Sequence, residues 1–312
     1  MDLVERVAAG DRRAIARLIS MVEDEEDGVR ELLARLRVNG ERAHVIGVTG
    51  PPGSGKSTLV MQLVRAFRRR GNAVGVIAVD PTSPFTGGAL LGDRIRMQDV
   101  ITDPGVFIRS MATRGHLGGL AEATADAVTV LEGAGKDVVI VETVGAGQAE
   151  VDIARTAHTT LVVEVPGLGD EVQAIKAGIM EIADIFVVNK ADRENADRVA
   201  MALEMALRLG PPGAWRPPII KAVAVRGRGV DELVAAIDQH IAFLHEDGRI
   251  RHLERERARF QILEMVEHRL VSRLVRAVGE PEMERIVEEV AERRADPYWA
   301  AERLLERLGL KG

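Results

Sequence analysis

Residues 50–57 combine the residue types and spacing that could bind phosphate. Gly50, Gly55, Lys56 and Ser57 fit the pattern G-x-x-x-x-G-K-[ST], which is typical of a phosphate-binding loop. Lysine supplies a cation for the β and γ phosphates of a nucleotide, and the serine hydroxyl supplies a ligand for Mg²⁺. We therefore predict nucleotide binding here. The predicted phosphate-binding residues are Gly50, Pro51, Pro52, Gly53, Ser54, Gly55, Lys56, Ser57 and Thr58.

A second motif, Asn189-Lys190-Ala191-Asp192, indicates which base is bound. It follows the apolar run 184–188, so we place it at the end of a strand. In an N-K-x-D sequence the Asp carboxylate accepts hydrogen bonds from N1–H and N2–H₂ of guanine. Adenine would leave this carboxylate buried and unpaired, which costs free energy. The motif predicts that Asn189, Lys190 and Asp192 bind GTP or GDP rather than ATP.

A third feature is Glu142, which ends the apolar run 138–141 and precedes Gly145. In phosphate-loop enzymes a carboxylate at this place coordinates Mg²⁺, directly or through water. Glutamate is one methylene longer than the more usual aspartate, so a water-mediated contact and a base-like role both stay open. We expect the Gly145 N–H to contact the γ phosphate.

A loop rich in proline and glycine, residues 80–97, begins at Asp80 and contains Asp93 near its far end. Such a loop can order around γ phosphate and Mg²⁺ and relax after hydrolysis. Asp80 and Asp93 are then metal or water ligands, and the alternative for Asp93 is an N-cap. The last candidate is a backbone contact from Ala222, Val223 or Ala224 to the guanine O6.

Short apolar runs alternate with amphipathic stretches between residues 44 and 245, which predicts an α/β fold with a mostly parallel sheet. Active sites of such sheets lie at the carboxyl ends of the strands, where every motif above begins. We expect an N-terminal helical extension (1–43), a nucleotide-binding domain (44–245) and a C-terminal helical arm (246–312). The predicted strands are 44–49, 73–79, 106–110, 138–142, 159–165, 184–189 and 219–224.

Composition excludes several classes of function. The 312 residues carry a net charge of −6, so nucleic acid is not an expected partner. No apolar run is long enough for a membrane span, and we expect no signal peptide. The absence of cysteine fits a reducing cytoplasm. The seven histidines form no cluster with the spacing of metal ligands, so we interpret them as structural or surface residues.

Two further stretches, together with the two motifs above, carry a resemblance to a known family. They are Asp80-Pro-Thr-Ser-Pro-Phe-Thr-Gly-Gly-Ala-Leu-Leu-Gly-Asp-Arg-Ile-Arg-Met97 and Glu142-Thr-Val-Gly-Ala-Gly-Gln-Ala-Glu150. In these residues the chain resembles the MeaB (ArgK) family of G proteins. The resemblance implies a phosphate-loop G domain of the signal-recognition-particle/MinD-like class, which binds GTP and Mg²⁺. It also implies a homodimer formed through the C-terminal arm. The implied function is a GTPase chaperone that gates cofactor loading of an adenosylcobalamin-dependent acyl-CoA mutase and protects it.

The chain departs from related patterns at two places. Ala222 stands where family members often have threonine, which leaves only the backbone contact. Ala146 stands where Ras-type G proteins have the glutamine that orients water, and Gln148 lies two residues further on. We therefore expect slow intrinsic hydrolysis. The predicted catalytic residues are Lys56, Asp93, Glu142 and Gln148, and the predicted metal ligands are Ser57, Asp80, Asp93 and Glu142.

Two other functions stay open at this point. One is a GTPase that assists metal insertion into another enzyme, but the chain lacks cysteine and clustered histidine. The other is a small-molecule kinase, which would prefer ATP, against the indication of residues 189–192.

Overall fold

A computed structural model of the chain describes residues 2–39, 42–80, 100, 102–112, 119–143, 149–167, 177–210 and 213–307. The chain divides into two compact units, residues 1–257 and 258–312. The domain boundaries expected at residues 43 and 245 stay a prediction.

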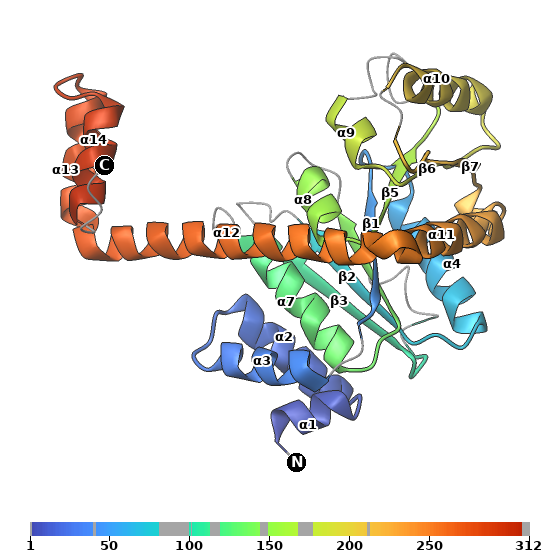
Figure 1. The fold of residues 1–312 in the computed structure, drawn as a ribbon, viewed down its shortest axis with the longest axis horizontal. Coiled ribbons are helices and arrows are strands. Elements are labelled where there is room, and N and C mark those ends of the chain that lie inside the picture. The colour runs from blue at the N-terminus through green and yellow to red at the C-terminus, as the bar shows by residue number, and fades with distance from the viewer. Residues whose placement is uncertain are drawn as a thin grey trace. The chain divides into compact units, whose positions relative to one another are not determined.

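The first unit is built on a seven-stranded sheet in which every neighbouring pair is parallel (Figure 1). The strand order is β3-β2-β4-β1-β5-β6-β7. The predicted parallel α/β sheet is therefore confirmed. The strands are β1 (His44–Thr49), β2 (Val74–Asp80), β3 (Val106–Ala112), β4 (Val138–Thr143), β5 (Thr159–Glu164), β6 (Ile185–Val188) and β7 (Ile219–Lys221).

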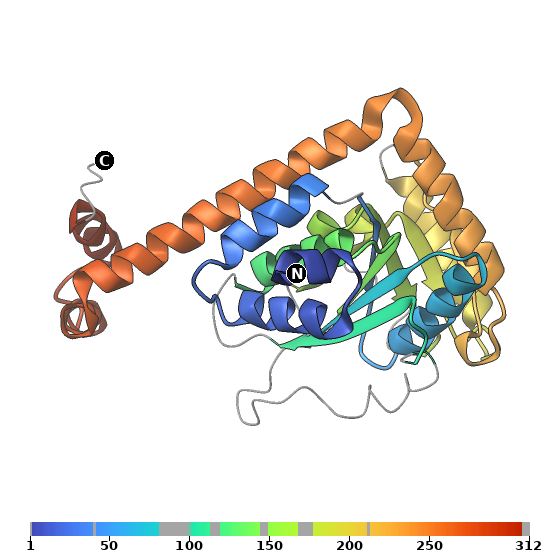
Figure 2. The ribbon, with the colours of Figure 1, turned by 90° about the horizontal axis from the view of Figure 1, so that it is seen from below.

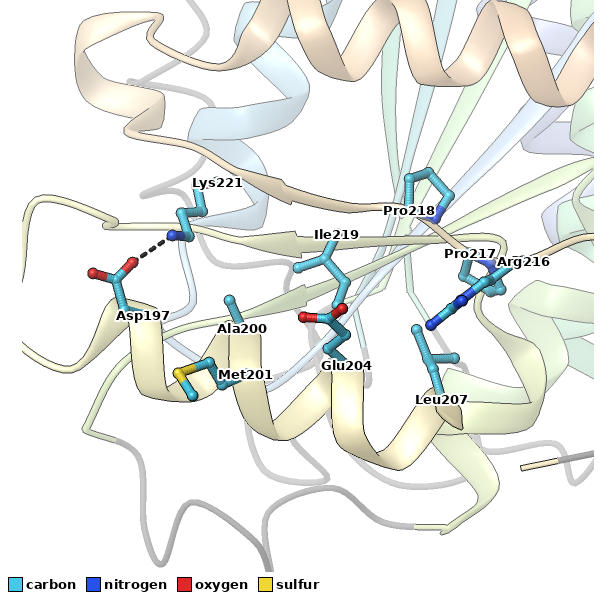
Figure 3. Close-up of a pocket in the computed structure, with 10 residues that line it drawn as sticks. All are labelled: Asp197, Ala200, Met201, Glu204, Leu207, Arg216, Pro217, Pro218, Ile219 and Lys221. Carbon is cyan, nitrogen blue, oxygen red and sulfur yellow. Dashed lines mark hydrogen bonds and ion pairs between the residues drawn. The ribbon is translucent and has the colours of Figure 1, made fainter. Parts of the chain in front are cut away.

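The predicted last strand, 219–224, was too long at its carboxyl end. β7 stops at Lys221 because the chain then turns into a 3-10 helix, Ala224–Arg226. Val223 pairs with Arg228 in an isolated antiparallel bridge, which closes this turn. β7 forms one edge of the sheet, and a helix of residues 196–209 runs beside it (Figure 3).

Helices cover both faces of the sheet (Figure 2). α4 and α11 share one buried cluster with the strands, while α1, α2, α3, α7 and α8 share the cluster on the opposite face. The helices are α1 (Leu3–Ala8), α2 (Arg12–Glu23), α3 (Val29–Asn39), α4 (Lys56–Arg69), α7 (Gly119–Gly133), α8 (Ala149–Thr156), α9 (Ala177–Ile182), α10 (Ala196–Leu209) and α11 (Val230–His245).

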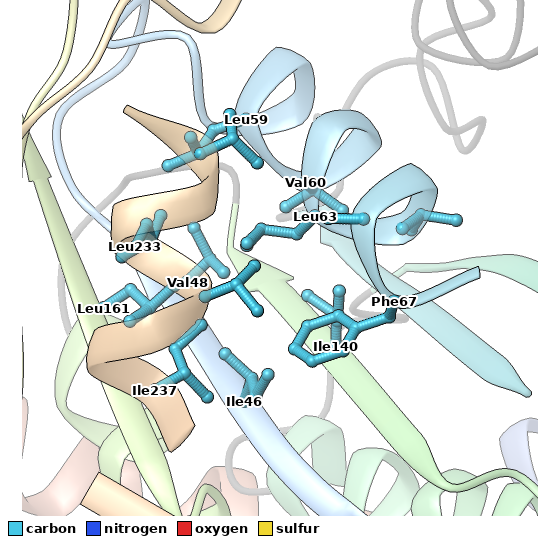
Figure 4. Packing of buried hydrophobic residues seen from close by; sticks show 14 of the residues in the cluster. Ile46, Val48, Leu59, Val60, Leu63, Phe67, Ile140, Leu161, Leu233 and Ile237 are labelled. Atoms are coloured by element: carbon cyan, nitrogen blue, oxygen red, sulfur yellow. The ribbon is translucent and has the colours of Figure 1, made fainter. Parts of the chain in front are cut away.

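One buried cluster packs α4 and α11 against β1 and its neighbouring strands (Figure 4). Ile46 and Val48 of β1 contribute to it, together with Leu59 and Leu63 of α4, and all four side chains are fully buried. Strands buried on both faces read as continuous apolar runs, which is why β1 was visible in the sequence. This packing fixes the end of β1 and the start of α4, the two elements that the loop joins.

The N-terminal helices belong to the same unit as the sheet. Asp11 caps α2, since its Oδ1 accepts hydrogen bonds from the backbone N–H groups of Arg13 (2.9 Å) and Ala14 (3.2 Å). Ile15 and Leu18 are at most 1% exposed and lie in the cluster that α7 shares. Helices α1, α2 and α3 thus complete the core on one face of the sheet.

His44, at the start of β1, and His240 of α11 meet at the amino ends of β1 and β5, away from the loops that follow the strands. His240 is 2% exposed, and His44 is half-buried. His44 Nε2 lies 2.8 Å from Thr159 Oγ1, which lies 2.8 Å from His240 Nδ1. His240 Nε2 in turn lies 3.3 Å from Asp184 Oδ1. Burial lowers the pKa of His44 to about 3 and that of His240 to about 4, and it raises the pKa of Asp184 to about 7. Both histidines are therefore neutral at physiological pH.

The second unit continues helix α12 (Arg249–Val278) from residue 258 and adds α13 (Glu280–Ala291) and α14 (Pro297–Arg307). Asp296 caps α14 by accepting hydrogen bonds from the N–H groups of Tyr298 and Trp299. Within the described residues, no helix is both long and apolar enough to cross a membrane.

The half-buried His44 gives a testable pH dependence of stability. Its folded-state pKa of about 3 lies below the ordinary value of 6.5, so the unfolded chain takes up a proton first as the pH falls. Stability from this site is complete above pH 6.5 and is lost below it, by about 2 kcal/mol at about pH 5. His44→Gln should show a smaller loss of unfolding free energy between about pH 7.5 and pH 5, measured with urea.

The carboxyl group of Asp184 changes the pH dependence of the unfolding free energy in the opposite direction, because its raised pKa stabilises the fold at low pH. It is present in both proteins, so it cancels in the comparison. Equal pH dependence of the two proteins would show that His44 is protonated in the fold.

Candidate nucleotide-binding site

Two glycines allow the phosphate-binding loop to pack closely against its neighbours. Gly50 has a φ of +139° and Gly55 a φ of +89°, a region that other residues disfavour. A Cβ on Gly50 would lie 2.2 Å from the carbonyl oxygen of Val163, and one on Gly55 would lie 2.5 Å from Asn189 Nδ2. The loop is thus fitted between β5 and the start of the second motif.

Lys56 begins α4 and turns its side chain back over the loop. Its Nζ donates to the carbonyl oxygens of Gly50 (2.8 Å) and Pro51 (3.0 Å), and the residue is 5% exposed. Gly55, the N-cap of α4, offers no side-chain acceptor to the first turn of the helix. A buried cation and a helix N-terminus therefore meet at the loop, an arrangement that favours phosphate.

Ser57 and Glu142 bring a hydroxyl and a carboxylate together beside the loop. The register of β1 and β4 pairs Val48 with Glu142, so the carboxylate stands next to the end of β1. Ser57 Oγ donates to Glu142 Oε1 at 2.6 Å, and Glu142 is 4% exposed. Hydroxyl and carboxylate oxygens are the ligands that Mg²⁺ prefers. The residues present therefore fit this metal.

The side chain of Asn189 joins three loops. Its Nδ2 donates to the carbonyl oxygen of Ser54 (2.8 Å), and its Oδ1 accepts from the N–H of Ala224 (3.1 Å). The residue is 2% exposed, and its own N–H donates to the carbonyl oxygen of Glu164 at 2.8 Å. One buried amide thus connects the phosphate-binding loop, the end of β6 and the turn after β7.

The two charged residues of the second motif lie at the same place. Lys190, with a φ of +56°, donates from Nζ to the carbonyl oxygen of Gly53 at 2.7 Å. The Asp192 Oδ2 lies 3.8 Å from Arg226 Nη2. The Asp192 side chain is 37% exposed, so its carboxylate is accessible from solvent.

The backbone donors at 222–224 already have partners within the protein. The N–H of Ala222 donates to Val188 (2.9 Å), that of Val223 to Arg228 (2.9 Å) and that of Ala224 to Asn189. The predicted contact with the guanine O6 would have to replace one of these hydrogen bonds.

Several predicted site residues lie outside the described part of the chain. These are Asp93, Gly145 and Gln148. Of Asp80 only the backbone is described, as the last residue of β2 beside Ala112 of β3. The structure thus brings together Lys56, Ser57 and Glu142, and joins them to the second motif through Asn189.

Sequence reasoning missed two features of the site. The motif marked Asn189 as a base-site residue but gave no sign that it holds two other loops. Arg226, which pairs with Asp192, was not predicted, because an arginine after a strand is usually solvated and carries no motif. Only the path of the chain after β7 reveals it.

Comparison with known proteins identifies the family. The family profile described as "Methylmalonyl Co-A mutase-associated GTPase MeaB" matches residues 15–279 of this chain. The chain belongs to the MeaB family. It is therefore a phosphate-loop GTPase, and the resemblance seen in the sequence is confirmed.

Relatives of the MeaB family match along most of their length. A protein of Pyrococcus abyssi named as a GTPase is 51% identical over 311 residues, covering 98% of this chain and 96% of the relative. The GTPase ArgK of Escherichia coli K12 is 36% identical over 266 residues, covering 82% and 80%. A crystal structure of a LAO/AO transport system kinase is similar with a TM-score of 0.74 and 27% identity, covering 99% and 97%.

The bridging amide predicts a combined loss of stability and nucleotide binding. Asn189→Ala should lower the free energy of unfolding by about 2 kcal/mol, because it leaves the Ser54 carbonyl and the Ala224 N–H unsatisfied. It should also weaken GTP binding, measured by titration calorimetry. Arg208→Ala, which removes an exposed pair with Glu204, is the control and should change stability by less than about 0.5 kcal/mol. Wild-type stability and affinity in Asn189→Ala would contradict the bridging role.

Proposed function

We propose that the chain is a GTPase chaperone for an adenosylcobalamin-dependent acyl-CoA mutase of the methylmalonyl-CoA mutase type. In this role it gates cofactor loading and protects the mutase. The observation that carries the proposal is the family profile, which names that mutase and matches residues 15–279. The site supports the GTPase part of the function, since its hydrogen bonds join a phosphate-binding loop to a guanine motif.

The geometry supports a proposed role for each of these residues. Lys56 attracts the β and γ phosphates, since its buried ammonium group lies over the loop. Asp192 accepts hydrogen bonds from the guanine, and Asn189 keeps the base loop at a fixed place relative to the phosphates. The 2.6 Å contact of Ser57 with Glu142 supports both as ligands of Mg²⁺, with Asp80 and Asp93 as the further candidates. When bound, the metal neutralises charge on the phosphates.

We propose that hydrolysis is slow until the mutase binds. The position that holds a water-orienting glutamine in Ras-type proteins is Ala146 here. Asp93, Glu142 and Gln148 are the three candidates for positioning the attacking water. A partner that contacts the segments 80–97 and 143–150 would fix such a group in place and stabilise the transition state.

This gives a direct test of the proposed function. Adding an adenosylcobalamin-dependent methylmalonyl-CoA mutase should raise the rate of GTP hydrolysis at least about tenfold, measured by phosphate release. Lys56→Ala should stay inactive with and without the mutase. Fast hydrolysis by the chain by itself, or a rate that the mutase leaves unchanged, would contradict the chaperone role.

We also propose that the chain forms a homodimer through its second unit. Six apolar side chains on α12 are between 42% and 61% exposed: Ile262, Leu263, Val266, Leu270, Val271 and Val275. An exposed stripe of this length favours burial against another helix.

A charge on this stripe should separate the subunits. Leu263→Glu combined with Leu270→Glu should convert a dimer into a monomer in sedimentation velocity, with GTP affinity unchanged as the control. A wild-type chain that sediments as a monomer would contradict the proposed dimer.

A further inference from the structure

Helix α10 is apolar on two sides. Ala196 and Leu203 are buried in the small cluster over β5 and β6. On the outer side Met201, Met205 and Leu209 recur every fourth residue and are 63%, 65% and 86% exposed. A helix with a second apolar stripe is typical of an element that another molecule covers. Methionine suits such a surface, because its flexible side chain adapts to the shape of a partner.

A groove of about 650 Å³ lies between α10 and the edge strand β7. Ala200 and Leu207 point from α10 toward the other wall, where Ile219 and Pro217 lie (Figure 3). Met201 also lines the groove, so the outer stripe of α10 continues into it. Its volume is that of a site for a few side chains rather than for a small ion.

The charges of the groove are unevenly matched. Lys221 pairs with Asp197 at one end, as the dashed line in Figure 3 shows. Glu204 accepts from Arg208 Nη2 at 2.7 Å. Within the described residues, Arg216 at the other end has no ion-pair partner. Three of the four charged residues that line the groove thus have ion-pair partners, and Arg216 gives its end of the groove a positive charge.

Both walls of the groove lead directly into the base-binding loops. β7 ends at Lys221, and the next residue, Ala222, accepts a hydrogen bond from the N–H of Ala191 at 3.0 Å. α10 begins at Ala196, four residues after Asp192. A ligand that moves either wall therefore acts on the loops that hold the guanine.

We propose that this groove docks a segment of another protein that presents apolar side chains next to a carboxylate. The apolar side chains cover Met201 and Leu207, and the carboxylate pairs with Arg216. This inference goes beyond the proposed function and does not depend on which protein is the client.

The test begins with random peptides displayed on phage and selected against the full-length chain. Recovered peptides should carry two or more apolar residues beside Asp or Glu, and each is then synthesised and titrated. Met201→Glu and Arg216→Glu should each weaken binding at least about fivefold, because they place a carboxylate where the peptide brings an apolar group or a charge of the same sign. Arg198→Glu is the matched control, since Arg198 is exposed on α10 but does not line the groove.

A peptide with Lys in place of its acidic residue should bind Arg216→Glu better than wild type. Three results would overturn the proposal. Either no peptide is recovered, or only basic peptides are recovered, or both groove variants bind the recovered peptides with wild-type affinity. The proposal would also be overturned if the chain associates with itself and both groove variants abolish this association, because the groove would then bind a second copy of the chain.

Peptide affinity is also measured with and without GDP. The continuity of the groove walls with residues 191 and 222 should make the two dissociation constants differ by about fivefold or more. Equal constants would show that the groove is not coupled to the base-binding loops.

Discussion

The buried amide of Asn189 is the interaction on which the rest of the site depends. Phosphate-binding loops and guanine-binding loops are separate stretches of chain, and nothing in their own residues sets the distance between them. Asn189 sets this distance here, because its Nδ2 donates to the carbonyl oxygen of Ser54 and its Oδ1 accepts from the N–H of Ala224. Because the amide is buried, losing either bond leaves a backbone group without a partner. The fold therefore keeps the two halves of a nucleotide site at a fixed separation.

The parallel sheet explains why these loops meet. β1 lies between β4 and β5, so the loop after β1 stands between Glu142 and the turn that ends β5. At the opposite ends of the strands, Thr159 of β5 contacts the neutral His44 of β1 and His240 of α11, which holds these three elements together away from the site. The candidate site thus occupies one edge of the sheet, and a polar network stabilises the other.

Much of this arrangement could be predicted from the sequence, because it is local. The strands appear as apolar runs, and Gly50 to Ser57 form a motif whose spacing has one common structure. The bridge through Asn189 could not be predicted, since it joins residues 135 positions apart. The end of β7 was also misplaced, because the bridge between Val223 and Arg228 is set by the turn and not by hydrophobicity. Features that depend on contacts between loops far apart in the sequence can be identified only from the structure.

The central claim is that one guanine nucleotide contacts both Lys56 and Asp192, and titration calorimetry of Asp192→Asn tests it most directly. In buffer with Mg²⁺, wild type should bind GTP and not ATP. The variant should lose about a hundredfold or more in GTP affinity and bind xanthosine triphosphate instead, because an amide pairs with the C2 carbonyl of xanthine but not with the C2 amino group of guanine. A variant that keeps its preference for GTP, or a wild type that binds ATP equally well, would contradict the account.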